Sequence, residues 1–460
     1  MRRRRSMGRR GTFILRLTIF FGVTILLCLS CNNNSLDGFI VAVELPEGNE
    51  NSMDGAALIA VDPINPEKTA RSLSEDFHSA CQPVLSNNGR YLIFSGKKRL
   101  EDSWQIWRMD LQKKSTNRVT DLSEDCTHPA FLPDGKIVFS RSGLIKDVDI
   151  STLFKCNMDG SELQQLTFHP HMDLASSVLM DGRILYTSSQ RYPREKNPVY
   201  MVMRPDGTKS EIFYRGNQGN SPVSSGTESE EGSVYFIERN YENQGGRLMM
   251  LNQNRPLNSS VVLSEGLKGE FRSVIPLGSS LCLVSYRSSS NLPFALHEFD
   301  TEEQKILQQV FASESDVVDP VIIQARKRPR ILPSNVNPEN PTGLLMSQDI
   351  NHSLIPANGE VTNDTVADHI HIVGLEGVMS EVEVKEDGSF YLKIDADIPI
   401  RILSINEQGE TIRGPSDWFW LRPNERRGCV GCHADPELAP DNIQPLAVRH
   451  PPTIVSAKQK

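Results

Sequence analysis

A repeat of about 47 residues constrains the fold of this 460-residue chain more than any other feature of its sequence. Strand–turn–strand signatures carry turn glycines at Gly89, Gly135, Gly182, Gly232 and Gly278. Successive glycines lie 46, 47, 50 and 46 residues apart. Short apolar strands that end in polar turns alternate with them, at Asp62, Asp110, Asp159, Asp206, Gln253, Asp300 and Asp349. Two hairpins per period make one four-stranded blade, so the sequence predicts an all-β propeller whose blades stack around an axis.

The number of blades depends on how the repeat closes. Five inner hairpins are clear, a sixth is degraded near residues 318–323, and seven outer turns are present. If residues 38–62 complete the last blade, the propeller has six blades. We therefore predict a six-bladed propeller over residues 38–325, with seven blades as the alternative. A helical repeat is excluded because the apolar runs are short, β-branched and interrupted by glycine.

A smaller β region follows the repeats. Residues 326–345 are basic and proline-rich, which is typical of a linker or boundary. Residues 346–460 contain alternating apolar and polar runs with tight turns at Gly388 and Gly409. This pattern predicts a small antiparallel β-sandwich. The tail after residue 433 is rich in proline, and we expect it to be extended.

Cys429, Cys432 and His433 form a Cys-x-x-Cys-His sequence within this C-terminal region. Two thiols at this spacing can form thioether bonds to the vinyl groups of haem, and the imidazole can bind its iron. The alternatives are a disulfide within the motif or a structural zinc site, although zinc would usually need a second Cys or His pair, and none lies near. We predict a c-type haem, with thioether bonds at Cys429 and Cys432 and with His433 as the proximal iron ligand.

Three histidines of the repeats are candidates for the second iron ligand. His78 and His171 each lie eleven residues before a turn glycine, and His128 lies seven before another. In a propeller this stretch leads into the innermost strand, near the mouth of the central channel. Each can equally be a solvated or hydrogen-bonded loop histidine, and ligation requires that the C-terminal domain dock there. The weaker candidates are the methionines and His169, His369, His371 and His450.

The N-terminal segment predicts export. Seven arginines and no acidic residue precede or flank a run of 13 apolar residues at 17–29. This length suits the core of a signal peptide and is short for a membrane-spanning helix, which needs about 20 residues. Cys31 follows Ser30 as in a bacterial lipoprotein signal; ordinary cleavage and an uncleaved anchor are the alternatives. We expect residues 1–31 to be a signal peptide and the protein to be periplasmic or in the cell envelope, with membrane contact only through a lipid on Cys31.

The net charge of the chain argues against one class of partner. The formal net charge is −9, and removing the seven leader arginines leaves −16 (−9 minus 7). A body this acidic repels phosphate backbones, so we expect no nucleic-acid partner.

Cys81 and Cys126 occupy similar places in adjacent blades and can be either a disulfide or packed free thiols. We find no nucleophile–base pair, phosphate-binding glycine loop or paired carboxylates.

Several stretches resemble a known family. The repeats resemble TolB-type propellers, and residues 151–160, 181–187, 203–208, 386–390 and 421–433 are similar to the hydrazine synthase alpha subunit and its relatives. The resemblance implies a six-bladed propeller, a haem-bearing domain, and a second histidine on this haem supplied by the propeller. That subunit carries two c-type haems, with the active one elsewhere, whereas this chain has one Cys-x-x-Cys-His. Hydrazine synthesis is therefore not carried over.

Electron transfer is the function that these features predict. A single haem with two protein ligands leaves no open coordination site for a substrate. We therefore expect a redox partner, either a protein or a complex. One alternative is a haem-dependent oxidoreductase with a five-coordinate iron. Another is a propeller binding module whose haem is structural or sensory.

Overall fold

The computed structural model describes residues 36–46, 52–65, 70–189, 198–216, 219–240, 246–352, 366–431, 437 and 442–456. Apart from one short 3-10 helix, η2 (Leu446–Arg449), the regular elements in these residues are all β-strands, which confirms the predicted all-β class. None of the described helical segments has the length and apolar character needed to cross a membrane. The predicted signal peptide and Cys31 lie outside the described residues.

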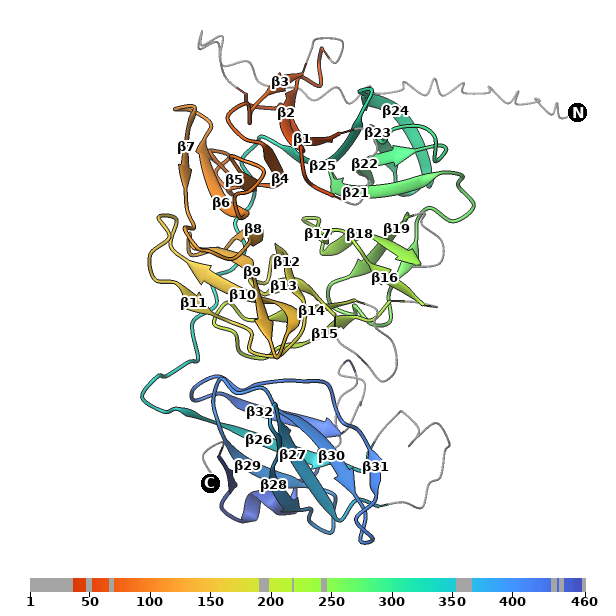
Figure 1. Ribbon diagram of the computed structural model, residues 1–460. Helices are drawn as coiled ribbons and strands as arrows, with labels where there is room; N and C mark the ends of the chain where they lie inside the picture. Colours follow the sequence, from red (N-terminus) through yellow and green to blue (C-terminus); the bar gives the residue numbers. More distant parts are fainter. Residues whose placement is uncertain are drawn as a thin grey trace, which may run out of the picture. The chain divides into compact units, whose positions relative to one another are not determined.

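Residues 40–322 form six sheets, each built on four strands (Figure 1). One contains β4 (Ser79–Leu85), β5 (Tyr91–Lys97), β6 (Gln105–Asp110) and β7 (Ser115–Arg118). The next contains β8 (Cys126–Phe131), β9 (Ile137–Ile145), β10 (Val148–Cys156) and β11 (Gln164–Gln165). A third contains β12 (Asp173–Val178), β13 (Ile184–Ser188), β14 (Val199–Met203) and β15 (Glu211–Tyr214).

The other three sheets follow the same plan. One contains β16 (Asn220–Pro222), β18 (Ser233–Asn240), β19 (Gly246–Asn252) and β20 (Val261–Val262), with the short β17 (Thr227–Glu228) also paired to β18. The next contains β21 (Glu270–Pro276), β22 (Leu281–Arg287), β23 (Ala295–Asp300) and β24 (Lys305–Phe311). The last contains β25 (Asp316–Ile322), β1 (Ile40–Leu45), β2 (Ala57–Val61) and β3 (Arg71–Ser72).

The two ends of this region meet in one sheet. β1 pairs with β25 in antiparallel register, with Ile40 opposite Ile322 and Leu45 opposite Asp316. The sequence predicted that residues 38–62 complete the last four-stranded unit, and this pairing agrees with it. The first strands of neighbouring sheets also contact one another: β25 with β4, β4 with β8, β8 with β12, and β21 with β25.

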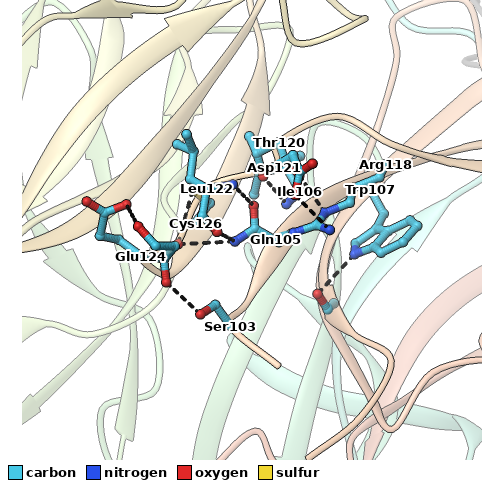
Figure 2. A network of polar contacts seen from close by, with 12 residues as sticks. Ser103, Gln105, Ile106, Trp107, Arg118, Thr120, Asp121, Leu122, Glu124 and Cys126 are labelled. Carbon is cyan, nitrogen blue, oxygen red and sulfur yellow. Dashed lines mark hydrogen bonds and ion pairs between the residues drawn. The ribbon is translucent and has the colours of Figure 1, made fainter. Parts of the chain in front are cut away.

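Side-chain hydrogen bonds fix the connection from one sheet to the next (Figure 2). The buried amide of Gln105, on β6, donates to the carbonyl oxygens of Leu122 and Glu124 at 2.9 and 3.1 Å. It also accepts from the backbone N–H of Leu122 at 3.1 Å. The amide is therefore fully used, so its burial carries no cost of unpaired polar atoms, and the segment between β7 and β8 is held in place.

The C-terminal region contains two more sheets. The first has the strand order β32 (Arg426–Gly431), β26 (Thr342–Asp349), β29 (Phe390–Asp395) and β33 (Thr453–Val455). The second has the order β28 (Gly377–Glu383), β27 (His369–Gly374), β30 (Arg401–Ile405) and β31 (Thr411–Arg413). Along β29 the residues Phe390, Leu392 and Ile394 are buried and alternate with half-buried neighbours, which is the period-two pattern of a strand with one face in the core.

Two details of this region differ from the prediction. The first sheet is mixed, because β32 runs parallel to β26 and β33 runs parallel to β29. Both strands join the sheet after long connections, which parallel pairing requires. The tail is also not simply extended, since η2 and β33 follow the proline-rich stretch and β33 pairs with Leu392–Ile394.

The segment 326–341 contains no strand, yet its backbone is bonded to turns of the repeat region. The N–H of Arg326 donates to the carbonyl of Asn87 at 2.8 Å, and the N–H of Arg330 donates to that of Met180 at 3.0 Å. Further along, the N–H of Asn335 donates to a carboxylate oxygen of Asp206 at 2.7 Å. This segment therefore follows a fixed path along the turns.

Candidate functional site

Cys429 lies near the end of β32, an edge strand of the mixed sheet. It is opposite Ser347 of β26, and Gly431 is opposite Asp349. Its thiol is free, half-buried and packed against the C-terminal hydrophobic core. Burial raises the pKa of the Cys429 thiol, although the nearby Arg427 guanidinium opposes the shift. Cys432 and His433, the other predicted haem-binding residues, lie outside the described residues.

Of the two residues between the motif cysteines, Gly431 has no room for a side chain. A Cβ atom on Gly431 would lie 2.3 Å from the carbonyl oxygen of His352 and 3.0 Å from its imidazole Cδ2. A backbone oxygen cannot move aside as a flexible side chain can, so only glycine fits. Sequence analysis did not single out His352, although it lies beside the motif, because the pairing of β26 with β32 is invisible in a single sequence.

The structure separates the three predicted second-ligand histidines. His78 is exposed, and its backbone N–H bonds to the carbonyl of Lys98. His128 lies in a β-bulge with φ of +52°, and both of its ring nitrogens have partners. Nε2 is 2.8 Å from the Gln82 amide nitrogen, and Nδ1 is 3.0 Å from the Thr127 hydroxyl. Burial lowers the pKa of His128 to about 4, so it is neutral at physiological pH.

His171 is buried next to a second imidazole. Its ring centroid lies 4.8 Å from that of His169, and its backbone N–H donates to the carbonyl of His169 at 3.0 Å. His169 is fully buried, and its Nε2 lies 3.1 Å from the carboxylate of Asp173, itself fully buried. This approach has the distance of an ion pair but lacks the alignment of a hydrogen bond.

The C-terminal region covers this histidine pair. The indole of Trp420 is buried, and its centroid lies 5.0 Å from that of the His169 ring. Trp420 belongs to the same hydrophobic cluster as Ala175 of β12 and Tyr186 of β13. Burial raises the pKa of the nearby Asp417 to about 6, against the attraction of His169 and Arg215. The side chains that meet here therefore come from 169–173 and from 417–420.

Several polar atoms at this junction are buried without a hydrogen-bond partner among the described residues. They are the two ring nitrogens of His169, one carboxylate oxygen of Asp173 and the indole nitrogen of Trp420. Leaving such an atom unsatisfied costs about 1–3 kcal/mol. Their concentration in one place marks the junction as a candidate site for a bound group. Asp173 was missed from the sequence, although its position four residues after His169 was a usable signal.

The remaining predicted residues lie elsewhere. The imidazole of His371 is 3.2 Å from the Glu381 carboxylate on the neighbouring strand, His369 is half-buried at the start of β27, and His450 is exposed after η2. Cys81 and Cys126 are buried free thiols, as are Cys156 and Cys282, so the packed-thiol alternative holds for the first two. Within the described ranges, no three His, Cys, Asp or Glu side chains are arranged to hold a metal ion.

Comparison with known proteins links the motif to a family. Residues 345–434 match the model of the hydrazine synthase alpha subunit middle domain, a range that includes Cys429, Cys432 and His433. The curated hydrazine synthase subunit alpha of Kuenenia stuttgartiensis is 20% identical over 496 residues. This chain is similar to the hydrazine synthase alpha subunit. The alignment covers 80% of the chain but 61% of that relative, so the chain spans less than two thirds of its length.

Solved structures extend the relation to the fold. Hydrazine synthase from Kuenenia stuttgartiensis superposes with a TM-score of 0.76 at 18% identity, over 89% of this chain and 71% of that one. The fold shared with that structure therefore includes both the repeats and the C-terminal sheets. TolB from Acinetobacter baumannii gives a TM-score of 0.47 at 14% identity, over 62% of this chain and 66% of that one.

Proposed function

We propose that this chain is an exported c-type haem protein that transfers electrons, with haem bound through Cys429, Cys432 and His433. The observation that carries the proposal is the free Cys429 thiol on the end of β32, inside the region similar to the hydrazine synthase alpha middle domain. Cys432 and His433 follow it directly in the sequence. When bound, haem supplies reversible one-electron chemistry at its iron.

The residues described around Cys429 fit a covalently held apolar group. The thiol is not committed to a disulfide, and it packs against the apolar core that includes Leu345 and Leu392. Two residues further along β32, Gly431 lies against His352, where no side chain fits. β32 and its parallel partner β26 therefore hold the first attachment point on a regular element instead of a loop, which favours a fixed orientation.

His171 is the propeller histidine that best supports the role of second iron ligand. It is buried and lies beside His169, which contacts Trp420, nine residues before Cys429. His78 is exposed, and both ring nitrogens of His128 are engaged by protein partners. Two histidine ligands leave the iron no open position, which suits a relay. In this proposal the six sheets of residues 40–322 form a six-bladed ring, supported by the pairing of β1 with β25.

The proposal also covers the cellular location of the protein and its redox partner. The arginine-rich leader and its apolar run support export to the periplasm or cell envelope, and Cys31 supports lipid anchoring. The similarity to a protein named as a subunit supports a protein partner. The haem would give electrons to this partner or receive them from it.

The test is expression with a working cytochrome c assembly pathway, followed by mass measurement and haem staining of the mature protein. We expect covalent haem in the wild type and in the control Cys282→Ala, which removes a buried thiol outside the motif. We expect the attachment to be lost or halved in Cys432→Ala. Colourless wild-type protein without the added mass of a porphyrin would contradict the proposal.

The relation to hydrazine synthase also favours a second candidate, a haem-dependent oxidoreductase with an open iron site. Visible spectra of the reduced protein with and without carbon monoxide separate the two. Unchanged bands indicate a six-coordinate relay, and a rapid shift indicates an open iron. In the relay, His171→Ala should open the iron to carbon monoxide, whereas His78→Ala should not.

A further inference from the structure

A cavity of about 690 Å³ lies between the segment 327–330 and the turns of two sheets of the repeat region. This volume is within the usual range for small-molecule sites, roughly 300–1,000 Å³. Its apolar lining includes Ile212 and Phe213 of β15 and Leu257 from the loop after β19. Four cationic and three acidic side chains complete it: Arg183, Lys327, Arg328, Arg330, Asp181, Glu211 and Glu437.

Part of this charge is neutralised inside the cavity wall. The Arg183 guanidinium contacts Asp181 at 2.7 Å and Glu211 at 3.0 Å. Glu437 accepts from the Leu257 backbone N–H and from the Asn258 side-chain amide, both at 2.7 Å. These acidic groups therefore already have partners and compete only weakly for the cations of the segment.

The other cations that line the cavity are Lys327, Arg328 and Arg330. None of them has a carboxylate within ion-pair distance in the part of the chain that the structure describes, and all three are exposed. Their backbone is held at both ends, by Arg326 N–H to Asn87 and by Arg330 N–H to Met180. Three cations without an ion-pair partner among the described residues thus lie at the rim of a partly apolar cavity, whose lining carries a net formal charge of +1 (four cations minus three acids).

The sign of these three cations is opposite to the net charge of the protein, which is about −16 without the leader arginines. A concentrated positive field at a concave site attracts anions. We propose that the cavity binds an organic anion, a carboxylate with an apolar body. Its charge lies against Lys327, Arg328 and Arg330, and its body lies against Ile212, Phe213 and Leu257.

Two sources can supply this chemistry. One is a free carboxylate from solution. The other is the propionate groups of the proposed haem, because Glu437, four residues after His433, lines the same cavity. The binding chemistry itself does not depend on the haem proposal, so the two can fail separately.

The test uses the full-length protein produced without a cytochrome c assembly pathway, so that no haem is attached, and anilinonaphthalene sulfonate, a fluorescent apolar anion, with octanoate as competitor. We expect saturable binding that octanoate displaces and that weakens as salt is added. The variant Lys327→Gln/Arg328→Gln/Arg330→Gln should bind about tenfold more weakly or worse. The charge-matched control Arg99→Gln/Lys113→Gln/Lys114→Gln changes exposed cations that do not line the cavity, and should bind normally.

Both variants are first checked for an unchanged unfolding transition, so that lost binding reports on the cavity. Comparison with haem-loaded wild type then separates the sources: blocked binding assigns the cavity to haem carboxylates, and retained binding assigns it to a free carboxylate. Binding that is not saturable, or that the triple cavity variant leaves unchanged, overturns the proposal. If wild type carries no haem but the cavity variant still loses binding, the anion site stands and the haem proposal fails.

Discussion

The stretches that lead into β4 and into β12 occupy the same place in the repeat but have different surroundings. His78 and His171 each lie eleven residues before the turn glycine of their sheet. His78 is exposed, whereas His171 is 8% exposed. The C-terminal region contacts the second stretch, because Trp420 lies against His169, the ring neighbour of His171, and packs into the cluster that contains Ala175 of β12. The cluster around β4 draws its members from residues 36–111 and 294–323, and none from the described C-terminal strands.

This comparison teaches that equal positions in a repeat do not imply equal environments. The repeat sets where the backbone goes, and a later part of the chain decides which of the equivalent positions is covered. A buried histidine pair arises only where that cover exists.

Removing the cover should have the largest effect. Trp420→Ala removes a buried indole and should lower the free energy of unfolding by about 3–5 kcal/mol. Trp104→Ala, a half-buried indole that packs against the cluster around β4, should cost roughly 1–2 kcal/mol. Denaturant titration measures both. In Trp420→Ala, His171 should also become reactive toward diethyl pyrocarbonate, as we expect of the exposed His78 in the wild type; continued protection of His171 would contradict the proposed cover.

The turn glycines of the same two sheets give the second test. Gly89 and Gly182 have φ of +73° and +93°, so alanine is strained at both, by about 1–2 kcal/mol. A Cβ at Gly182 would also lie 2.3 Å from the Arg330 carbonyl, while one at Gly89 would lie 3.2 Å from the nearest atom, the nitrogen of Ala325.

Gly182→Ala should therefore be more destabilising than Gly89→Ala by at least about 1 kcal/mol. Gly135→Ala is the control for strain alone, because its φ is +90° and a Cβ there would meet nothing within 4 Å. Equal thermal shifts for Gly182→Ala and Gly135→Ala would show that the 326–341 segment does not press on the Gly182 turn.

The histidines themselves should differ by a smaller amount. His171→Ala opens a gap in a buried cluster and should cost about 1–2 kcal/mol, while His78→Ala should stay within roughly 0.5 kcal/mol of wild type. Denaturant titration of the haem-free protein isolates this effect from any contribution of ligand. If the two variants are equally stable, the burial of His171 contributes nothing to stability.

The smallest effect is a pH dependence beneath the cover. The folded-state pKa of Asp417 is about 6, above its ordinary value of 3.8, so the folded state holds the proton more tightly than the unfolded state. Stability should therefore fall as pH rises from about 4 to 6, by on the order of 1 kcal/mol. Asp417→Asn should flatten this slope and stabilise the protein at pH 7. Asp76→Asn, on the exposed stretch before β4, should leave the slope in place; an unchanged slope in Asp417→Asn would contradict the burial of this carboxyl.

Much of the fold was readable from the sequence because it depends on local signals. The turn glycines Gly89, Gly135 and Gly182 all lie in tight turns with positive φ, and the strands on either side pair as the predicted hairpins. The pairing of β1 with β25 followed from counting the repeat. The parallel strands β32 and β33 were missed because a strand that arrives after a long connection leaves no pairing signal in the sequence.

The candidate site, like the fold, could be predicted from the sequence only in part. The Cys-x-x-Cys-His spacing was visible from residue types alone, and haem binding by Cys429, Cys432 and His433 stays a prediction; the last two lie outside the described residues. The neighbours of the site were not visible. Nothing in the sequence relates His352 to Gly431, Trp420 to His169, or Glu437 to Lys327.

The all-β class, the hairpin repeat and the one motif suited to covalent haem all follow from the order of residues along the chain. These properties rest on backbone preferences and on residue chemistry, which act within a few positions of the chain. Only the tertiary structure decided which of the equivalent histidines is buried and which cations face a cavity. Those outcomes depend on contacts between residues more than a hundred positions apart, and packing of that kind is set by the whole fold.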